Sequence, residues 1–289
     1  MLKAHQHLFQ KVAFVCQQFE LQGADGRARM ARRWQPSVAV TGRMGIVHGL
    51  GEHAGRYDHG VESFCRAGIE VVAFDLIGHG LSGGPRGHVS DYALLLDDID
   101  VLVRELQRHE DSRPCWLYGH SLGGNLVLNY VLRRSPALSG LIITSPLLLP
   151  AFPPPLWKRM LAAVLNHVYP SAVFSTAIDP ADLSHDPRAV QCYREDPLVH
   201  DRVSVRLGVQ MLAAGRWALE HADRLALPTL LMHGTGDRIT SAAASLSFAQ
   251  RAGPICTLKL WPDLYHELQW ETERDMVLAV ILDWLRQHC

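Results

Sequence analysis

The sequence predicts one α/β domain built on a mostly parallel central sheet, with flanking helices and an inserted helical cap. Three observations carry this prediction. Short apolar runs alternate with amphipathic helical stretches, glycine-rich loops follow several of the apolar runs, and a proline-interrupted segment breaks the alternation near the middle of the chain. A length of 289 residues suits a single α/β domain that carries an insertion.

Composition excludes several classes of function. The chain has 28 Lys and Arg against 29 Asp and Glu, a formal net charge of -1, so no long-range field would gather nucleic acid or an anionic membrane. The six cysteines are scattered singly without metal-ligand spacing, and we expect free, mostly buried thiols and neither a metal nor another cofactor. The sequence has no signal-peptide core and no apolar run of membrane-spanning length, which favours a cytoplasmic protein and leaves peripheral membrane association open.

The first elements form an edge hairpin and a strand–helix–strand unit. Residues 11–34 read as two short strands around a turn at 23–26. A buried strand over 44–48 leads into a glycine-rich loop, and a helix over 60–68 precedes a strand over 69–74. A second glycine-rich loop follows, and an amphipathic helix over 92–109 carries Asp97 and Asp98 on its polar face. This rhythm is typical of a parallel sheet.

The second half continues the sheet around an insertion. Strands are predicted over 115–118, 138–145, 229–233 and 256–260, with a core helix ending near 225 and a closing helix over 272–286. Residues 146–205 form the cap, so that 1–145 and 206–289 form the core. Inside the cap, a helix over 156–168 carries a wide apolar stripe beside Lys158 and Arg159. Two interpretations stay open: the stripe packs over a pocket, or its outer side contacts lipid.

The stretch from Gly119 to Gly124 has the pattern of a nucleophile elbow. An apolar strand precedes it and a helix follows it, so Ser121 stands on a tight strand-to-helix turn. Gly119 and Gly123 let the backbone turn there without a Cβ clash. A serine hydroxyl is a weak nucleophile that needs a base, and the base needs an acid to orient it. Ser121 is therefore the predicted nucleophile.

The acid and the base are expected after two later strands. In α/β-hydrolases the acid and then the histidine follow the serine along the chain. Asp237 lies on the turn after the strand at 229–233, and His266 lies on the loop after the next strand. We therefore predict Asp237 as the acid and His266 as the base. His233, inside its strand, is predicted to be a core residue, and Asp263 lies too close to His266 in sequence to replace Asp237.

Two backbone N–H groups are needed to bind the oxyanion of the tetrahedral intermediate. Leu122, which follows the nucleophile, is expected to supply one of them. Leu50 is expected to supply the other, because it lies in an H-G-x-G sequence that begins at His48. Asp75 and Ser82, in the second glycine-rich loop, are predicted to support the architecture of the site.

Together these motifs resemble the monoacylglycerol lipase and lysophospholipase group of α/β-hydrolases, a branch also catalogued with serine aminopeptidases. The likeness rests on residues 48–57, 75–82, 119–124 and 196–198 and on the loops of Asp237 and His266, and it covers nearly the whole chain after residue 19. The resemblance implies an α/β-hydrolase fold whose cap shapes an acyl-binding tunnel. It also implies that Glu52 and Arg56 lie near the polar head of a glyceride; bracing of their loop is the alternative.

These inferences lead us to expect a metal-independent serine esterase acting on a small lipid monoester, foremost monoacylglycerol. Lysophospholipids and a broad range of carboxylic esters are the alternative substrates. Aminopeptidase-like activity would call for a carboxylate in the cap, for which the candidates are Asp179, Asp182, Asp186, Glu195 and Asp196. A non-catalytic hydrolase fold that binds a ligand is the remaining alternative.

Overall fold

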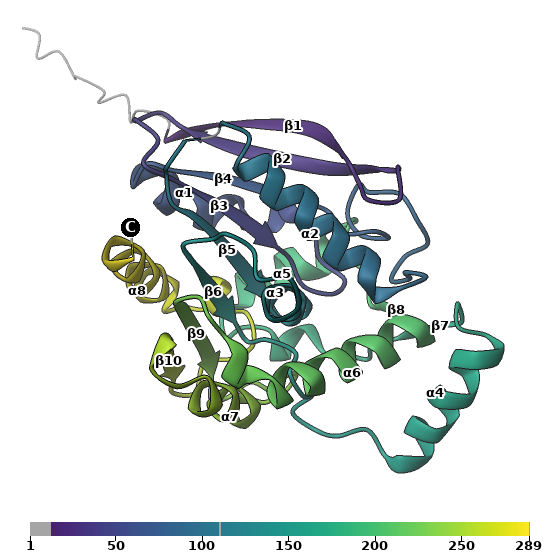
Figure 1. Ribbon diagram of the computed structural model, residues 1–289. Helices are drawn as coiled ribbons and strands as arrows, with labels where there is room; N and C mark the ends of the chain where they lie inside the picture. The colour runs from purple at the N-terminus through teal and green to yellow at the C-terminus, as the bar shows by residue number, and fades with distance from the viewer. Residues whose placement is uncertain (1–12, 110, 289) are drawn as a thin grey trace, which may run out of the picture.

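The computed structural model describes residues 13–109 and 111–288, and an eight-stranded sheet lies at its centre (Figure 1). The strands follow the order β1-β2-β4-β3-β5-β6-β9-β10 across the sheet. β1 pairs antiparallel with β2, and β2 with β4, while all the other pairs in this sheet are parallel. The strands are β1 Phe14–Gln22, β2 Ala28–Pro36, β3 Gly42–Val47, β4 Ile69–Phe74, β5 Cys115–His120, β6 Gly140–Thr144, β9 Thr229–Gly234 and β10 Cys256–Trp261. The predicted mostly parallel sheet is confirmed.

Helices cover both faces of this sheet. One cluster of buried apolar side chains joins the sheet to α1 and α8, and a second joins it to α2, α3, α6 and α7. Because both faces are covered, β3, β4, β5, β6 and β9 are buried along their whole length. The helices are α1 Asp58–Arg66, α2 Tyr92–Leu106, α3 Leu122–Arg134, α6 Val205–Glu220, α7 Ala242–Ala252 and α8 Arg274–Gln287, with short 3-10 turns η1 Ala54–Tyr57, η3 Ala222–Arg224, η4 Gly253–Ile255 and η5 Leu268–Trp270.

The predicted elements agree with the structure apart from a few differences. The hairpin expected over 11–34 is β1 and β2, although residues 11 and 12 lie outside the described part of the chain. The helix expected over 92–109 ends at Leu106. The prediction that Asp98 lies on the polar face of this helix is wrong, because Asp98 is buried and accepts a hydrogen bond from Arg29 Nε at 2.8 Å. The hairpin supplies the cation that makes this buried carboxylate tolerable.

The chain leaves the sheet between β6 and α6. This segment contains α4 (Leu156–Val168), β7 (Val173–Ser175), η2 (Pro180–Asp182), α5 (Pro187–Glu195) and β8 (Arg202–Ser204). β7 and β8 pair with each other in a separate two-stranded sheet. After α5, Asp196 contacts His53 in the loop that follows β3, with Oδ2 2.8 Å from the histidine Nε2. The segment is therefore tied to the core close to the predicted oxyanion loop.

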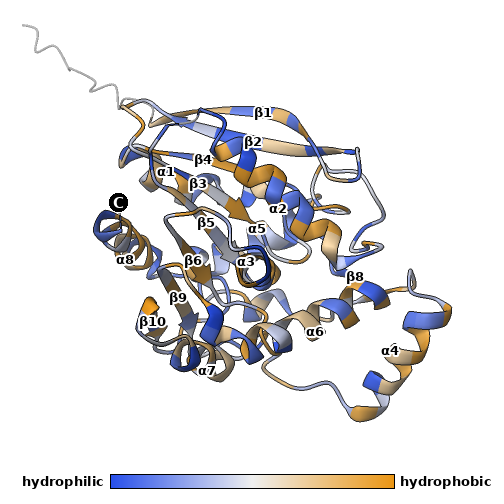
Figure 2. Cartoon of the chain, viewed as in Figure 1, coloured by the Kyte–Doolittle hydropathy of each residue, from blue (hydrophilic) through white to orange (hydrophobic). Residues whose placement is uncertain are grey.

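The apolar stripe of α4 faces solvent. The helix projects from the side of the molecule (Figure 1), and hydrophobic positions, coloured orange, recur along its ribbon in Figure 2. The exposed fractions lie between 50% and 72% for Leu156, Trp157, Met160, Leu161, Val164 and Val168. This exposure favours the lipid-contact interpretation over packing across a pocket. Leu165, which also belongs to the stripe, is half-buried, as are Ala162 and Asn166. No helix in the described ranges is long and apolar enough to cross a membrane.

The five described cysteines carry free thiols. Cys65, Cys115 and Cys256 are buried, as expected, whereas Cys16 and Cys192 are exposed. Cys289 lies outside the described residues.

Candidate active site

Ser121 occupies the turn between β5 and α3. Its backbone has φ 54° and ψ -115°, a conformation that side-chain-bearing residues rarely adopt. The sharp turn therefore falls on the serine itself, and the flanking glycines supply the space that it needs. A Cβ on Gly123 would stand 1.9 Å from the Val47 carbonyl oxygen, and one on Gly119 would stand 2.6 Å from that of Gly123. This is the strained geometry expected of a nucleophile elbow.

Asp237 and His266 are in direct contact. Nδ1 of His266 lies 2.7 Å from Oδ2 of Asp237. Because an ionised carboxylate can only accept, Nδ1 carries the proton, and Nε2 is left as the basic atom of the ring. The ring of His266 also lies 4.9 Å, centroid to centroid, from that of His120, the residue before Ser121. The loops after β9 and β10 therefore bring the predicted acid and base to the elbow.

Asp237 is buried and accepts five hydrogen bonds. Oδ1 accepts from the backbone N–H groups of Ile239 at 2.7 Å and Thr240 at 3.0 Å. Oδ2 accepts from His266, from the Thr240 hydroxyl at 2.7 Å, and from Nε2 of His233 at 3.0 Å. Burial opposes ionisation, but the charge of His266 and these hydrogen bonds hold the pKa of Asp237 well below its ordinary value. The carboxylate is therefore charged at neutral pH.

The pKa of His266 reflects its surroundings in the protein. Burial by itself would lower the pKa of this imidazole, but the charge of Asp237 and the hydrogen bond to it more than offset that effect. Glu267 and Glu52 act in the same direction. The net result is a raised pKa for His266, which suits the role of general base predicted for it.

The predicted oxyanion donors flank Ser121. Leu122 begins α3, where the first N–H groups have no acceptor inside the helix and the helix dipole favours negative charge. Leu50 follows Gly49, which lies against the elbow: a Cβ on Gly49 would be 3.2 Å from Cβ of Ser121. Both N–H groups thus belong to backbone that lies beside the nucleophile.

His48 fixes the orientation of the Leu50 N–H group. Its Nε2 accepts from the Leu76 N–H at 2.9 Å, so its Nδ1 must be the atom that donates to the Gly49 carbonyl at 2.8 Å. In a trans peptide the C=O and the next N–H point in opposite directions, so holding the Gly49 carbonyl also fixes the Leu50 N–H. Burial lowers the pKa of His48 to about 4, which keeps the ring neutral in this role.

Asp75 and Ser82 support the same loop, as predicted. Asp75 accepts from the N–H groups of Ala54 at 2.8 Å and Leu81 at 2.7 Å. The Ser82 hydroxyl donates to the Asp75 carbonyl at 2.6 Å. These contacts tie the second glycine-rich loop to the loop that carries Leu50.

Arg56 is buried and its guanidinium is bound by protein groups. It donates to both carboxylate oxygens of Glu267, at 2.7 and 2.8 Å. Its charged group also lies over the rings of Tyr193 and Trp270, 4.7 and 5.3 Å from their centroids. These contacts favour loop bracing over contact with a glyceride head group.

Glu52 is also buried, and it closes the turn after β3. Its Oε1 accepts from the Gly49 N–H at 2.6 Å and from the Tyr57 hydroxyl at 3.0 Å. Its Oε2 lies 3.5 Å from Arg56. The contacts of Glu52, like those of Arg56, favour the bracing alternative.

His233 is the residue of this site that the sequence did not reveal. It lies on β9 and is fully buried, as expected of a core residue. Its Nε2 nevertheless contacts the predicted catalytic carboxylate. The available signal in the sequence was its position near the end of a strand, four residues before Asp237.

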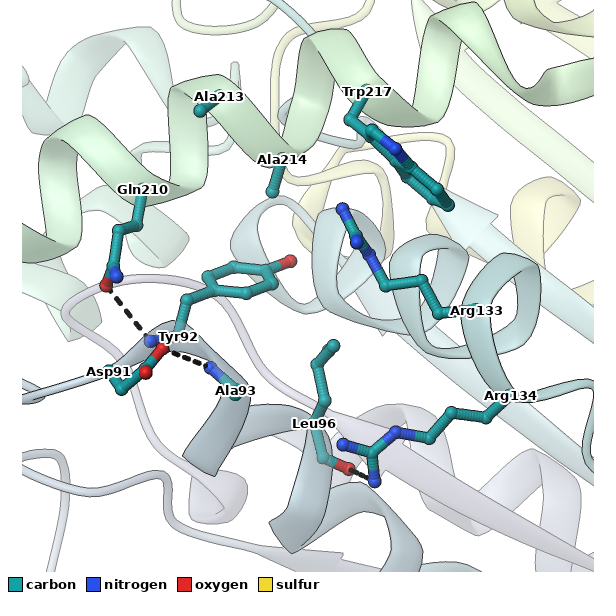
Figure 3. A pocket seen from close by; sticks show the side chains of 10 residues that line it. All are labelled: Asp91, Tyr92, Ala93, Leu96, Arg133, Arg134, Gln210, Ala213, Ala214 and Trp217. Carbon is teal, nitrogen blue, oxygen red and sulfur yellow. Dashed lines mark hydrogen bonds between the residues drawn. The ribbon is translucent and has the colours of Figure 1, made fainter.

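Sizeable cavities lie outside this constellation: one of about 490 Å³ is lined in part by Arg43 and Asp111, and two others are of similar size. One of about 540 Å³ lies between α2, α3 and α6, where Arg133 stands beside Trp217 (Figure 3). The other, of about 570 Å³, lies between the segment around α5 and Tyr265, the residue before His266. Neither is lined by Ser121, Asp237 or His266, so neither is an acyl-binding tunnel that leads to the nucleophile. Within the described ranges, no group of three or more His, Cys, Asp or Glu side chains is arranged to hold a metal ion.

Known proteins resemble this chain over most of its length. A family model described as serine aminopeptidase, S33, matches residues 39–273. The monoglyceride lipase of Rattus norvegicus is 35% identical over 92% of this chain and 89% of its own. An uncharacterized abhydrolase domain-containing protein of Dictyostelium discoideum is 36% identical over 91% of this chain, which spans 28% of that protein. The crystal structure of Paleococcus ferrophilus monoacylglycerol lipase matches with 35% identity and a TM-score of 0.83, over 90% of this chain and 99% of its own. The protein therefore belongs to the serine aminopeptidase S33 family of α/β-hydrolases.

Proposed function

We propose that this protein is a serine hydrolase that cleaves monoacylglycerol to glycerol and a free fatty acid. The observation that carries the proposal is the buried contact between His266 and Asp237 beside the strained elbow at Ser121. The choice of substrate is supported by the likeness to the monoglyceride lipase of Rattus norvegicus and to the monoacylglycerol lipase of Paleococcus ferrophilus.

In the proposed reaction, Ser121 Oγ attacks the ester carbonyl carbon while Nε2 of His266 takes the hydroxyl proton. Asp237 stabilises the imidazolium, and the N–H groups of Leu50 and Leu122 bind the oxyanion. Collapse of the intermediate breaks the ester bond, and the glycerol oxygen leaves with the proton from His266. Water then attacks the acyl-serine in the same way, which releases the fatty acid and restores Ser121.

A peptidase that binds a free amino terminus is less well supported. Such an enzyme would need a carboxylate in the cap that is free to bind an ammonium group. Four of the five candidates instead contact basic side chains: Asp179 with Arg194, Asp182 with Arg238, Asp186 with Arg274 and Asp196 with His53. The fifth, Glu195, accepts from the Gln191 amide. These contacts favour an ester over a peptide as substrate.

The proposal extends to the segment at 146–205, which we assign as a cap that meets the lipid surface through α4. The exposed apolar stripe of α4 is accompanied by Lys158 and Arg159, and no acidic residue occurs from 152 to 178. An apolar face with cations beside it suits the boundary of an anionic membrane. A substrate that resides in membranes would then be taken up at that boundary.

A fluorophosphonate probe and a substrate panel test the proposed function. We expect an adduct on Ser121, its loss in Ser121→Ala, and normal labelling of Ser247→Ala, which changes an exposed serine on α7. Rates are then compared for monoacylglycerols, lysophosphatidylcholine, short p-nitrophenyl esters and aminoacyl amides. Absence of an adduct in folded protein would contradict a serine hydrolase, and faster turnover of the amides would contradict a lipase.

A further inference from the structure

We infer that His233 is a positioning residue of the active site, one that holds Asp237 through a second imidazole-to-carboxylate hydrogen bond. This inference rests on the proposed serine-hydrolase function. His233 stands near the carboxyl end of β9, and Asp237 is on the turn that follows. The side chains of both residues are 0% exposed, so water does not compete for their contact.

The contacts of His233 define where its proton lies. Nε2 is 3.0 Å from Oδ2 of Asp237, and Nδ1 is 2.8 Å from Oγ of Ser245 on α7. Because the carboxylate is ionised and can only accept, Nε2 must be the protonated nitrogen. Nδ1 of the neutral ring then accepts from the Ser245 hydroxyl, which is also fully buried. Both ring nitrogens are thereby satisfied, and the ring is held between a strand and a helix.

This arrangement gives Asp237 a rigid anchor at Oδ2, the same oxygen that His266 contacts. His266 comes from a loop, whereas His233 is part of β9, a strand whose residues are all buried. Oδ2 cannot turn away from His266 without also losing the hydrogen bond to His233. A carboxylate held in this way keeps His266 in the tautomer whose Nε2 faces the nucleophile.

The same hydrogen bond sets how strongly Asp237 attracts the proton of His266. Each donor to Oδ2 draws negative charge toward itself and weakens the attraction felt by the other donors. Removing the N–H of His233 therefore leaves more charge facing His266 and favours its imidazolium. The other titratable groups that act on His266 are His120, whose ring lies 4.9 Å away, Glu267 and Glu52. A substitution at residue 233 leaves all three in place.

The test measures the rate of fluorophosphonate labelling of Ser121 and of hydrolysis of a soluble p-nitrophenyl ester across pH. His233→Phe keeps a ring but removes the donor, so we expect kcat to fall about 10- to 100-fold with little change in KM. We also expect the acid limb of the pH profile to move to higher pH. His233→Gln retains an N–H donor and should restore both quantities most of the way. His221→Phe, at the end of α6, is the control that should leave both unchanged.

Two results would overturn the inference. The first is an unchanged kcat in folded His233→Phe. The second is a rate that falls equally at every pH while the acid limb stays at the wild-type pH, because a purely structural role would give that pattern. If His233→Phe does not fold, His233→Asn is used in its place. The asparagine side chain is too short to reach Asp237, so this variant must show the same shift of the acid limb to higher pH. Labelling does not depend on which ester is the substrate. A wild-type protein that labels but cleaves no monoacylglycerol would therefore contradict the proposed substrate and leave this inference to be decided by the labelling profiles.

Discussion

Arg56 and Glu267 form a buried ion pair that joins the loop after β3 to the loop after β10, and both loops carry predicted catalytic groups. Arg56 belongs to the loop that carries Leu50, and Glu267 follows His266 directly. Two hydrogen bonds of 2.7 and 2.8 Å link the charged groups, and both side chains are 4% exposed. Burial opposes the charge of the guanidinium, but Glu267 and Glu52 raise the pKa of Arg56. The pair therefore stays charged and fixes the predicted base, His266, relative to the predicted oxyanion donor, Leu50.

Glu267→Gln should weaken both the fold and the reaction. The change leaves the buried Arg56 with Glu52 at 3.5 Å as its remaining carboxylate, and breaking a buried pair from one side typically costs about 3 kcal/mol or more. We expect the free energy of unfolding, measured by urea denaturation, to fall by about that amount, and kcat for a p-nitrophenyl ester to fall as well.

The matched control is Glu62→Gln on α1. Glu62 pairs with Arg66 at the surface, where the two side chains are 48% and 52% exposed. A surface pair of this kind contributes about 1 kcal/mol or less. Equal losses in the two variants would contradict the role given to the Arg56–Glu267 pair.

His48→Phe should lower kcat and leave KM nearly unchanged. Without the hydrogen bond to the Gly49 carbonyl, the Leu50 N–H loses its fixed direction, and loss of a complete oxyanion donor costs about 100- to 1000-fold in kcat. Because the N–H is misdirected but still present, we expect kcat of His48→Phe to fall by about 100-fold or less. Steady-state kinetics with a soluble ester measure it, and His109→Phe, at an exposed position, is the control. A rise in KM at constant kcat would contradict an oxyanion role.

The acid limb of kcat/KM should lie above pH 6.5. Protonated His266 cannot accept the proton of Ser121, so activity is present above the pKa of His266 and is lost as the pH falls through it. That pKa is raised above the ordinary value of 6.5 by the charge of Asp237 in spite of burial. Asp237→Asn should therefore move the limb to lower pH and reduce kcat by about 10,000-fold. A wild-type limb below pH 6.5 would show that burial outweighs the carboxylate.

The predictions made for the site from the sequence follow from local spacing and from the order of the elements along the chain. The elbow around Ser121 depends on glycines at fixed spacing between a strand and a helix. Asp237 and His266 follow from their order along the chain and from the common edge at which parallel strands end. The spacing within the elbow and the order of the strands can both be identified from the sequence.

Two other contacts could not be predicted from the sequence because they depend on tertiary packing. Arg56 and Glu267 are 211 positions apart, and no spacing rule links them. His233 has the pattern of a buried strand residue, and only the tertiary structure shows that its ring reaches Asp237. The stripe of α4 was ambiguous for a related reason: a helix that faces the core and a helix that faces a membrane have the same apolar periodicity.

The lipid-surface role proposed for α4 can be separated from the chemistry by mutation. Trp157, Met160 and Val164 are 60% to 62% exposed, so replacing all three by Glu should leave the fold intact. Each apolar side chain of this size contributes about 1.5 to 3 kcal/mol when it is fully transferred from water. We therefore expect the affinity for phosphatidylcholine–phosphatidylserine vesicles to fall at least about tenfold. Hydrolysis of vesicle-bound monoacylglycerol should fall with it.

Hydrolysis of a soluble p-nitrophenyl ester should not change in that triple variant, because α4 contributes none of the predicted catalytic groups. Met276→Glu on α8, at a position 56% exposed, is the control for added surface charge. Because Lys158 and Arg159 lie beside the stripe, wild-type binding should also weaken when phosphatidylserine is omitted or salt is raised. Equal vesicle binding by the triple variant and the wild type would mean that the exposed stripe does not contact the membrane. Loss of soluble-ester hydrolysis would instead mean that α4 shapes the catalytic site directly.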